Sequence, residues 1–113
     1  MADQAYEIKK DVTKKEVTVV LKGAFDERLL PQFMNDFKIS IATITTGEYT
    51  LHLDAKEFPV QTPDAVSKLV EVTRFYNTFG FKEIVLHKKD SAISAMQINR
   101  VLREANLQNV KVL

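Results

Sequence analysis

The chain contains 113 residues, of which 16 are Lys or Arg and 15 are Asp or Glu, so its formal net charge is +1. Hydrophobic residues make up 45% of it, too large a fraction, at so small a net charge, for a disordered chain. The charge balance also argues against a dedicated nucleic-acid binder, which would normally carry a basic stripe. Cysteine is absent, which excludes disulfides, a thiolate nucleophile and a Cys-based metal site.

The length predicts one domain over residues 1–113, because domains usually have about 100–150 residues and no repeat or linker divides this chain. The longest strongly apolar stretch, residues 17–21, is far shorter than the roughly 20 residues that cross a bilayer. Residues 1–5 lack the basic and apolar regions of a signal peptide. We therefore expect a cytoplasmic protein that has no membrane partner.

Alternating apolar and polar residues predict two strands near the start of the chain, around residues 6–8 and 17–22. The polar turn at residues 11–15 is short, so these strands are expected to be antiparallel neighbours. Gly23 ends the second strand.

The apolar period then lengthens to three or four residues, which predicts an amphipathic helix from about Leu30. Its stripe consists of Leu30, Phe33, Met34, Phe37, Ile41 and Ile44. Pro31 fits the first turn, where its missing N–H is not needed. Residues 46–47 close this helix, and residues 49–53 return to strand alternation.

A second helix is predicted to start at Thr62, Pro63 and Asp64, which supply a side-chain cap, a first-turn proline and an acid that complements the helix dipole. Its apolar face comprises Val66, Leu69, Val70, Val72, Phe75, Tyr76 and Phe79. Gly80 is placed for a C-terminal cap.

Residues 84–86 predict a short buried strand, and Asp90 and Ser91 predict the start of a third helix. The inner side of this helix is expected to carry Ile93, Ala95, Met96, Ile98, Val101, Leu102 and Ala105. Asn106 is expected to adopt a left-handed capping conformation, and residues 110–112 to add a final strand.

The resulting order is β-β-α-β-α-β-α-β. Single helices between strands imply right-handed crossovers, hence a parallel set to which the first strand is antiparallel. We therefore predict an α/β domain with a mixed β-sheet packed with helices. Loops and helix N-termini of such sheets converge at the carboxyl ends of the strands, which here gathers residues 23–27, 54–64 and 87–91 at one edge.

At this edge the sequence resembles the STAS domains typified by bacterial anti-sigma-factor antagonists, in element order and length over nearly the whole chain. Residues 23–26, Gly-Ala-Phe-Asp, are similar to the family's Gly-x-Leu-Asp turn, and residues 51–54, Leu-His-Leu-Asp, to its apolar strand ending in Asp. Residues 92–95 through 106–107 resemble its last helix and exit. The order and spacing of these motifs carry the resemblance.

One departure concerns the family's phosphorylation switch. In antagonist members the helix after the third strand opens with Asp-Ser-Ser-Gly, whose first Ser is phosphorylated by a partner kinase. The matching positions here are Thr62, Pro63, Asp64 and Ala65, so the phosphoacceptor position is a proline without a hydroxyl. Thr62 is expected to serve as the helix cap. Asp64 is either a fixed negative charge in place of the phosphate or an ordinary first-turn acid, and the latter is favoured.

The sequence does not favour an enzyme. His52 and His87 would approach each other, near Asp54, if their strands are neighbours. A solvated or packed histidine on each strand is nonetheless the preferred interpretation, because no third ligand, HxH or HExxH spacing completes a metal set. Glycine-rich phosphate loops are also missing. We expect no catalytic residue, metal or cofactor.

Two classes of function remain. The favoured one is a regulatory, non-catalytic interaction module that docks a protein partner, as the resemblance implies a kinase-like or sigma-regulator-like one. Its predicted docking residues are Asp26, Glu27, Lys56, Phe58, Val60, Thr62, Asp64, Lys88 and Asp90. Phe58 and Val60 are either apolar anchors of the interface or local core beneath their loop.

The alternative is a small-anion or nucleotide site formed by Lys88, Lys89 and Ser91 with the helix N-termini. Two lysines that are simply solvated are the plainer interpretation of this segment. A homo-oligomer formed through the exposed side of the sheet, as a structural component, is also consistent with the sequence.

Overall fold

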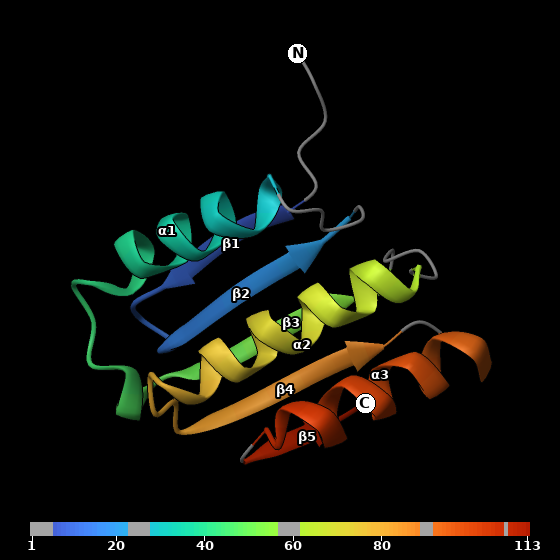
Figure 1. Ribbon diagram of the computed structural model, residues 1–113. Helices are drawn as coiled ribbons and strands as arrows, with labels where there is room; N and C mark the ends of the chain where they lie inside the picture. Colours follow the sequence, from blue (N-terminus) through green and yellow to red (C-terminus); the bar gives the residue numbers. More distant parts are fainter. Residues whose placement is uncertain (1–5, 23–27, 57–61, 89–91, 108) are drawn as a thin grey trace.

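The computed structural model of the protein describes residues 6–22, 28–56, 62–88, 92–107 and 109–113 (Figure 1). A five-stranded sheet follows the chain in the order β1-β2-β3-β4-β5. Its strands are β1 (Tyr6–Asp11), β2 (Glu16–Leu21), β3 (Thr50–Ala55), β4 (Glu83–Lys88) and β5 (Val110–Val112). β1 is antiparallel to β2, and the other neighbours are parallel. The predicted α/β class, mixed sheet and antiparallel first strand are confirmed.

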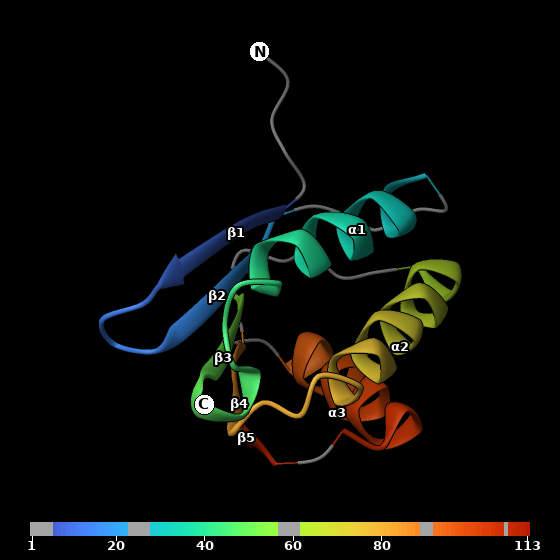
Figure 2. The same ribbon diagram turned by 90° about the vertical axis from the view of Figure 1, so that its left-hand side faces the viewer.

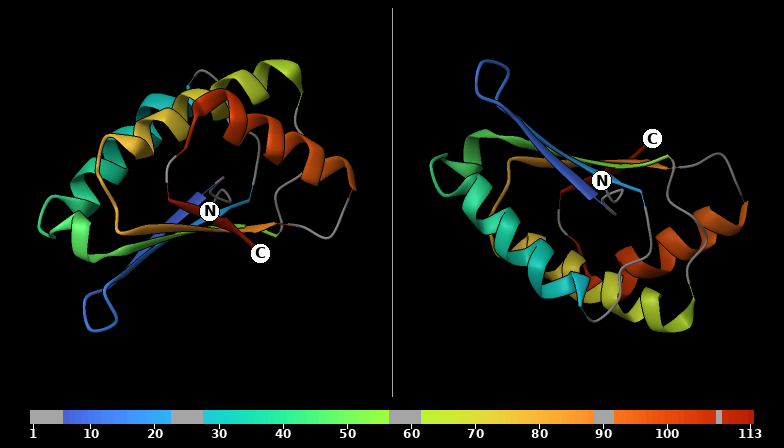
Figure 3. Two further views of the ribbon diagram at one scale, coloured as in Figure 1. Left: turned by 90° about the horizontal axis from the view of Figure 1, so that it is seen from below. Right: turned by 90° about the horizontal axis from the view of Figure 1, so that it is seen from above.

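Three α-helices in the described residues cover a single face of this sheet, as Figures 2 and 3 show from the side and along the layers. They are α1 (Leu29–Ile41), α2 (Pro63–Asn77) and α3 (Ala92–Ala105), and a short 3-10 turn, η1 (Thr46–Glu48), precedes β3. The described part of the chain is therefore a two-layer structure, and no helix within it covers the second face of the sheet; we call this the open face. No helix in the part of the chain that the structure describes is long and apolar enough to cross a bilayer.

The strands alternate because only one of their faces contacts the helices. Val17 and Val19 of β2 and Leu51 of β3 are fully buried beneath the helices, whereas the residues between them are half-buried on the open face. β4 departs from this pattern, since Ile84, Val85 and Leu86 are all buried. Period-two alternation thus marks β2 and β3, and a continuous apolar run marks β4.

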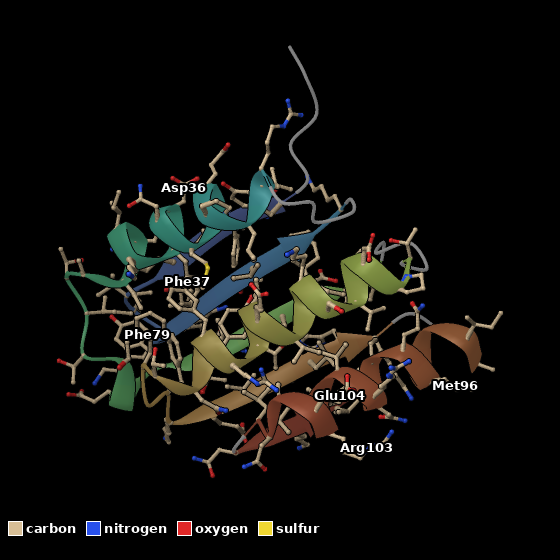
Figure 4. All side chains as sticks on the ribbon, in the orientation of Figure 1. Asp36, Phe37, Phe79, Met96, Arg103 and Glu104 are labelled. Atoms are coloured by element: carbon tan, nitrogen blue, oxygen red, sulfur yellow. The ribbon has the colours of Figure 1, made fainter. Side chains whose placement is uncertain are left out.

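An aromatic cluster joins α1 to α2 and fills the core between helices and sheet. Phe37 is fully buried at its centre, with its ring centroid 5.4 Å from those of Tyr76 and Phe79 and 6.0 Å from that of Phe75 (Figure 4). Such edge-to-face pairs contribute about 0.5–1.5 kcal/mol each beyond the apolar area they bury. The cluster explains why the apolar stripes of both helices are rich in aromatic residues.

Several predicted turns have the expected backbone. Asn106 is left-handed, with φ of 53°, as predicted for the end of α3. Gly80 is left-handed too, with φ of 65°, but it lies two residues beyond the C-cap Thr78. The turn at residues 11–15 is exposed, and Asp11 Oδ1 accepts a hydrogen bond from the Lys14 amide at 3.0 Å.

Two details of the helix predictions were wrong. α1 ends at Ile41, because the Ala42 and Ile44 amides bond to carbonyls three residues back and tighten the chain into a turn, yet Ile44 still packs on the core. On α3, Ile93 and Met96 were predicted to face inward, but they are 59% and 72% exposed. The first turns of α3 extend past the carboxyl end of β4, and Met96 lies at the outer end of the helix (Figure 4).

Candidate functional site

The carboxyl edge of the sheet brings together the four predicted docking residues that the structure describes: Lys56, Thr62, Asp64 and Lys88. Ala55 pairs with Lys88 in the β3–β4 register, so Lys56 immediately follows the end of the neighbouring strand. The N-terminal ends of α2 and α3 lie at this same edge (Figure 1). All four residues are exposed.

The first turn of α2 has the predicted cap. Thr62 is extended, with φ of −71° and ψ of 162°, and its hydroxyl oxygen accepts a hydrogen bond from the Ala65 amide at 3.2 Å. Pro63 occupies the start of the helix, and Asp64 is the acid of the first turn. The Thr62 hydroxyl therefore already holds a backbone donor that the helix leaves unpaired.

The end of β3 is held by Asp54. Its Oδ1 accepts from the Lys56 amide at 3.1 Å, and its Oδ2 lies 3.9 Å from Lys56 Nζ. Because the Lys56 side chain is 64% exposed, this ion pair adds little to stability. Lys88 donates its backbone N–H to the Leu113 carbonyl at 3.2 Å, and the residue is exposed at the end of β4.

The remaining predicted site residues lie outside the described residues. They are Asp26, Glu27, Phe58, Val60 and Asp90 of the docking set, and Lys89 and Ser91 of the alternative anion site. Whether Phe58 and Val60 are interface anchors or local core therefore stays a prediction.

A row of three polar side chains crosses the open face. Glu16 Oε2 lies 3.1 Å from His52 Nε2, and His52 Nδ1 lies 3.1 Å from His87 Nε2. The imidazole planes are inclined by 22°, with centroids 5.4 Å apart. The side chains of His52 and Glu16 are 21% and 39% exposed, so the row is only partly screened by solvent. We call these residues the Glu16–His52–His87 row.

The sheet register creates this row. Glu16 is paired with Thr50, two residues before His52, and His52 is paired with Val85, two residues before His87. Each contact thus joins two adjacent strands, and its second residue lies two positions beyond the residue directly opposite the first. Long side chains on one face of a sheet can span this diagonal. The approach of the two histidines was anticipated on the condition that their strands are neighbours. Glu16 was missed, because the offset between β2 and β3 is not written in the local sequence.

A shallow depression of about 250 Å³ accompanies the row. It is lined by Glu16, Thr18, His52, Asp54, Lys56 and His87, so it reaches from the row to the carboxyl edge. Among the described residues, no three His, Asp or Glu side chains are arranged to hold a metal ion. The side chains that line this depression can form hydrogen bonds and exchange protons.

A second hollow, of about 610 Å³, lies between α2 and α3 and was not foreseen. Val66 and Val70 form part of its lining, and charged residues of both signs, Arg74, Arg100 and Glu104, surround them. Arg100 and Glu104 are an ion pair of 3.6 Å, and Arg74 donates to the Glu104 carbonyl at 3.2 Å. Arg100 and Glu104 thus neutralise each other, whereas Arg74 is held by a backbone carbonyl.

Comparison with known proteins adds no assignment: no family model matches the chain, and no curated protein matches it. The α/β class stands on the structure alone. The resemblance to STAS domains stays a prediction.

Proposed function

We propose that the protein is a cytoplasmic, regulatory, non-catalytic interaction module of the STAS type, which docks a protein partner at the carboxyl edge of its sheet. The sheet order supports this proposal. The resemblance rests on the order of strands and helices along the chain, and in the structure the strands lie side by side in that same order, with the described helices on one face. The proposed partner is kinase-like or sigma-regulator-like, as the resemblance implies.

The observation that carries the proposal is the fixed, exposed first turn of α2. The Thr62 cap and Pro63 hold this turn, so Asp64 is presented without a cost of ordering the backbone on binding. Lys56 and Lys88 lie exposed at the ends of the neighbouring strands. Such an edge suits a partner whose surface offers both a cation for Asp64 and carboxylates for the lysines. Docking would not depend on phosphorylation at residue 63, because proline has no hydroxyl.

Replacing Asp64 with lysine tests the docking edge. We expect Asp64→Lys to reduce the amount of captured partner at least about tenfold in a quantitative pull-down, since it places a like charge against the partner's cation. The matched control is Glu83→Lys, the same charge change at an exposed residue at the other end of the β4 strand. It should leave capture unchanged.

The stability of both variants must be measured alongside. Loss of the helix-dipole interaction should cost Asp64→Lys no more than about 1 kcal/mol. Equal capture by wild type, Asp64→Lys and Glu83→Lys would remove the basis for docking at this edge.

Nothing in the described residues favours the alternatives over this proposal. The anion or nucleotide site stays a prediction, with only Lys88 of its three residues described. Self-assembly through the open face is likewise a prediction, which a mass measurement in solution would decide.

A further inference from the structure

The hydrogen-bond directions in the Glu16–His52–His87 row follow from its chemistry. A carboxylate only accepts, so His52 Nε2 donates its N–H to Glu16 Oε2. A neutral imidazole has one donor and one acceptor, so His52 Nδ1 is an acceptor, and His87 Nε2 donates to it. Both nitrogens of His52 and the Nε2 of His87 are thus used within the row. The lone pair on His87 Nδ1 is not used by the row. Glu16 thereby sets the tautomers of both rings.

We propose that the Glu16–His52–His87 row is a proton-binding site that takes up one proton, shares it between the two imidazoles, and breaks when a second proton is added. This inference is independent of the proposed docking edge. The first proton comes from solvent and adds to His87 Nδ1. The resulting imidazolium still donates from Nε2 to His52 Nδ1, so the N–H···N bond is kept and strengthened by its charge.

Glu16 balances this positive charge from the other end of the row. A second proton has to go onto His52 Nδ1, the atom that accepts the bond. Two N–H donors would then face each other across 3.1 Å, and two positive rings would lie side by side. The N–H···N bond is lost and the rings must separate. The pair therefore titrates in two coupled steps rather than as two independent histidines.

The other charged residues considered on the open face do not take the place of Glu16 beside the two imidazoles. Asp54 is engaged with Lys56 at the end of β3. In the register, Asp11 of β1 lies opposite Glu16, and Lys111 of β5 lies opposite Val85. Among the described residues, Glu16 is thus the carboxylate in contact with the imidazoles. Lys56 adds positive charge on the rim of the depression, which disfavours the second proton.

Breaking the row has a consequence for the fold because the row links β2, β3 and β4. In the unfolded chain the contacts of the row are absent, so each imidazole can bind a proton independently of the other. When the unfolded chain binds two protons and the folded row only one, lowering the pH lowers the stability. We therefore expect the open face to be a pH-sensitive junction. It is intact while the row holds at most one added proton, and it loosens at the lower pH at which the second proton binds.

Nuclear magnetic resonance of the imidazole nitrogens and protons of the full chain tests the proposal between pH 8.5 and 4.5. At the upper end we expect both histidines to carry the proton on Nε2. On acidification, two steps separated by about one pH unit or more should appear, each visible at both rings. Removing one ring, in His87→Gln, should reduce the response of His52 to a single step.

Glu16→Gln keeps an oxygen that can accept from His52 but removes the charge. It should move the first step to lower pH by about half a unit to one unit, given the partial exposure of the row. Glu83→Gln, the same change on the same sheet four residues from His87, should not move it. Two results in the unmodified protein would each overturn the proposal. One is a single step at each histidine that is not visible at the other ring, and the other is an Nδ1–H tautomer of His52 at pH 8.5.

Discussion

Two tyrosine hydroxyls in the same core have opposite surroundings. Tyr6 donates to Asp36 Oδ2 at 2.5 Å, and burial together with this bond to a carboxylate raises the pKa of Tyr6 to about 12. Tyr76 is 2% exposed, and its hydroxyl has no hydrogen-bond partner among the described residues. Burial raises the pKa of Tyr76 far above its ordinary value, so both phenols remain protonated donors at neutral pH. One donor is satisfied by a partner in the described structure and the other is not.

The same substitution should therefore have opposite effects at these two positions. We expect Tyr6→Phe to lower the free energy of unfolding by about 1–2 kcal/mol, because it leaves Asp36 without its donor. Tyr76→Phe keeps the ring in the aromatic cluster and should raise that free energy by up to about 1 kcal/mol, since an unpaired buried hydroxyl is removed. Urea denaturation of both variants measures the difference. A loss of similar size for Tyr76→Phe would mean that its hydroxyl has a partner in the folded chain.

Helices and strands were predictable where one face of the element is buried along its whole length. The stripes of α1 and α2 and the alternation of β2 and β3 meet this condition, and their positions agree with the structure to within a few residues. α3 does not meet it. Its stripe continues through Ile93 and Met96, but the sheet beneath it has ended, and periodicity cannot show where a neighbouring element stops.

The two halves of α3 should accordingly differ in their tolerance of substitution. Val101 is 8% exposed and packs with Val66, Val70 and Ala105 between α2 and α3. We expect Val101→Ala to cost about 1–2 kcal/mol through lost burial. Met96→Ala should change stability by no more than about 0.5 kcal/mol, because Met96 is exposed and alanine keeps the helix propensity. The midpoints of urea denaturation, compared at unchanged slope, test this; comparable losses would show that Met96 is covered in solution.

The candidate site was predictable to a different extent from the fold. The cap of α2 is local, so Thr62, Pro63 and Asp64 disclosed it in three consecutive residues. The Glu16–His52–His87 row depends on the register of three strands, and those strands are separated by helices whose packing sets the offsets. A pattern in one segment does not contain that information. The same holds for the hollow between α2 and α3, which exists only once the helices pack.

Taken together, the sheet order gives the protein a central unit and two edges. β2, β3 and β4 have neighbours on both sides and carry fully or largely buried residues, whereas β1 and β5 each have one neighbour and β5 is only three residues long. The turn at residues 11–15 lies at the outer end of the β1–β2 hairpin and is exposed. Local opening of the edges need not disturb the centre.

Native-state hydrogen exchange should reveal this gradient. We expect the slowest amides in β2, β3 and β4, where exchange requires global unfolding, and faster exchange at the outward amides of β1 and in β5, which open locally. Val12 and Thr13 should exchange fastest among these segments, because they lie in an exposed turn, whereas the amide of Lys14 in the same turn is held by Asp11. The measurement is made at a single pH above 7, so that the Glu16–His52–His87 row stays intact, and the rates are corrected for intrinsic exchange. If β5 is protected as strongly as β3, a further chain covers that edge in solution, and self-assembly along the sheet becomes the first explanation to examine.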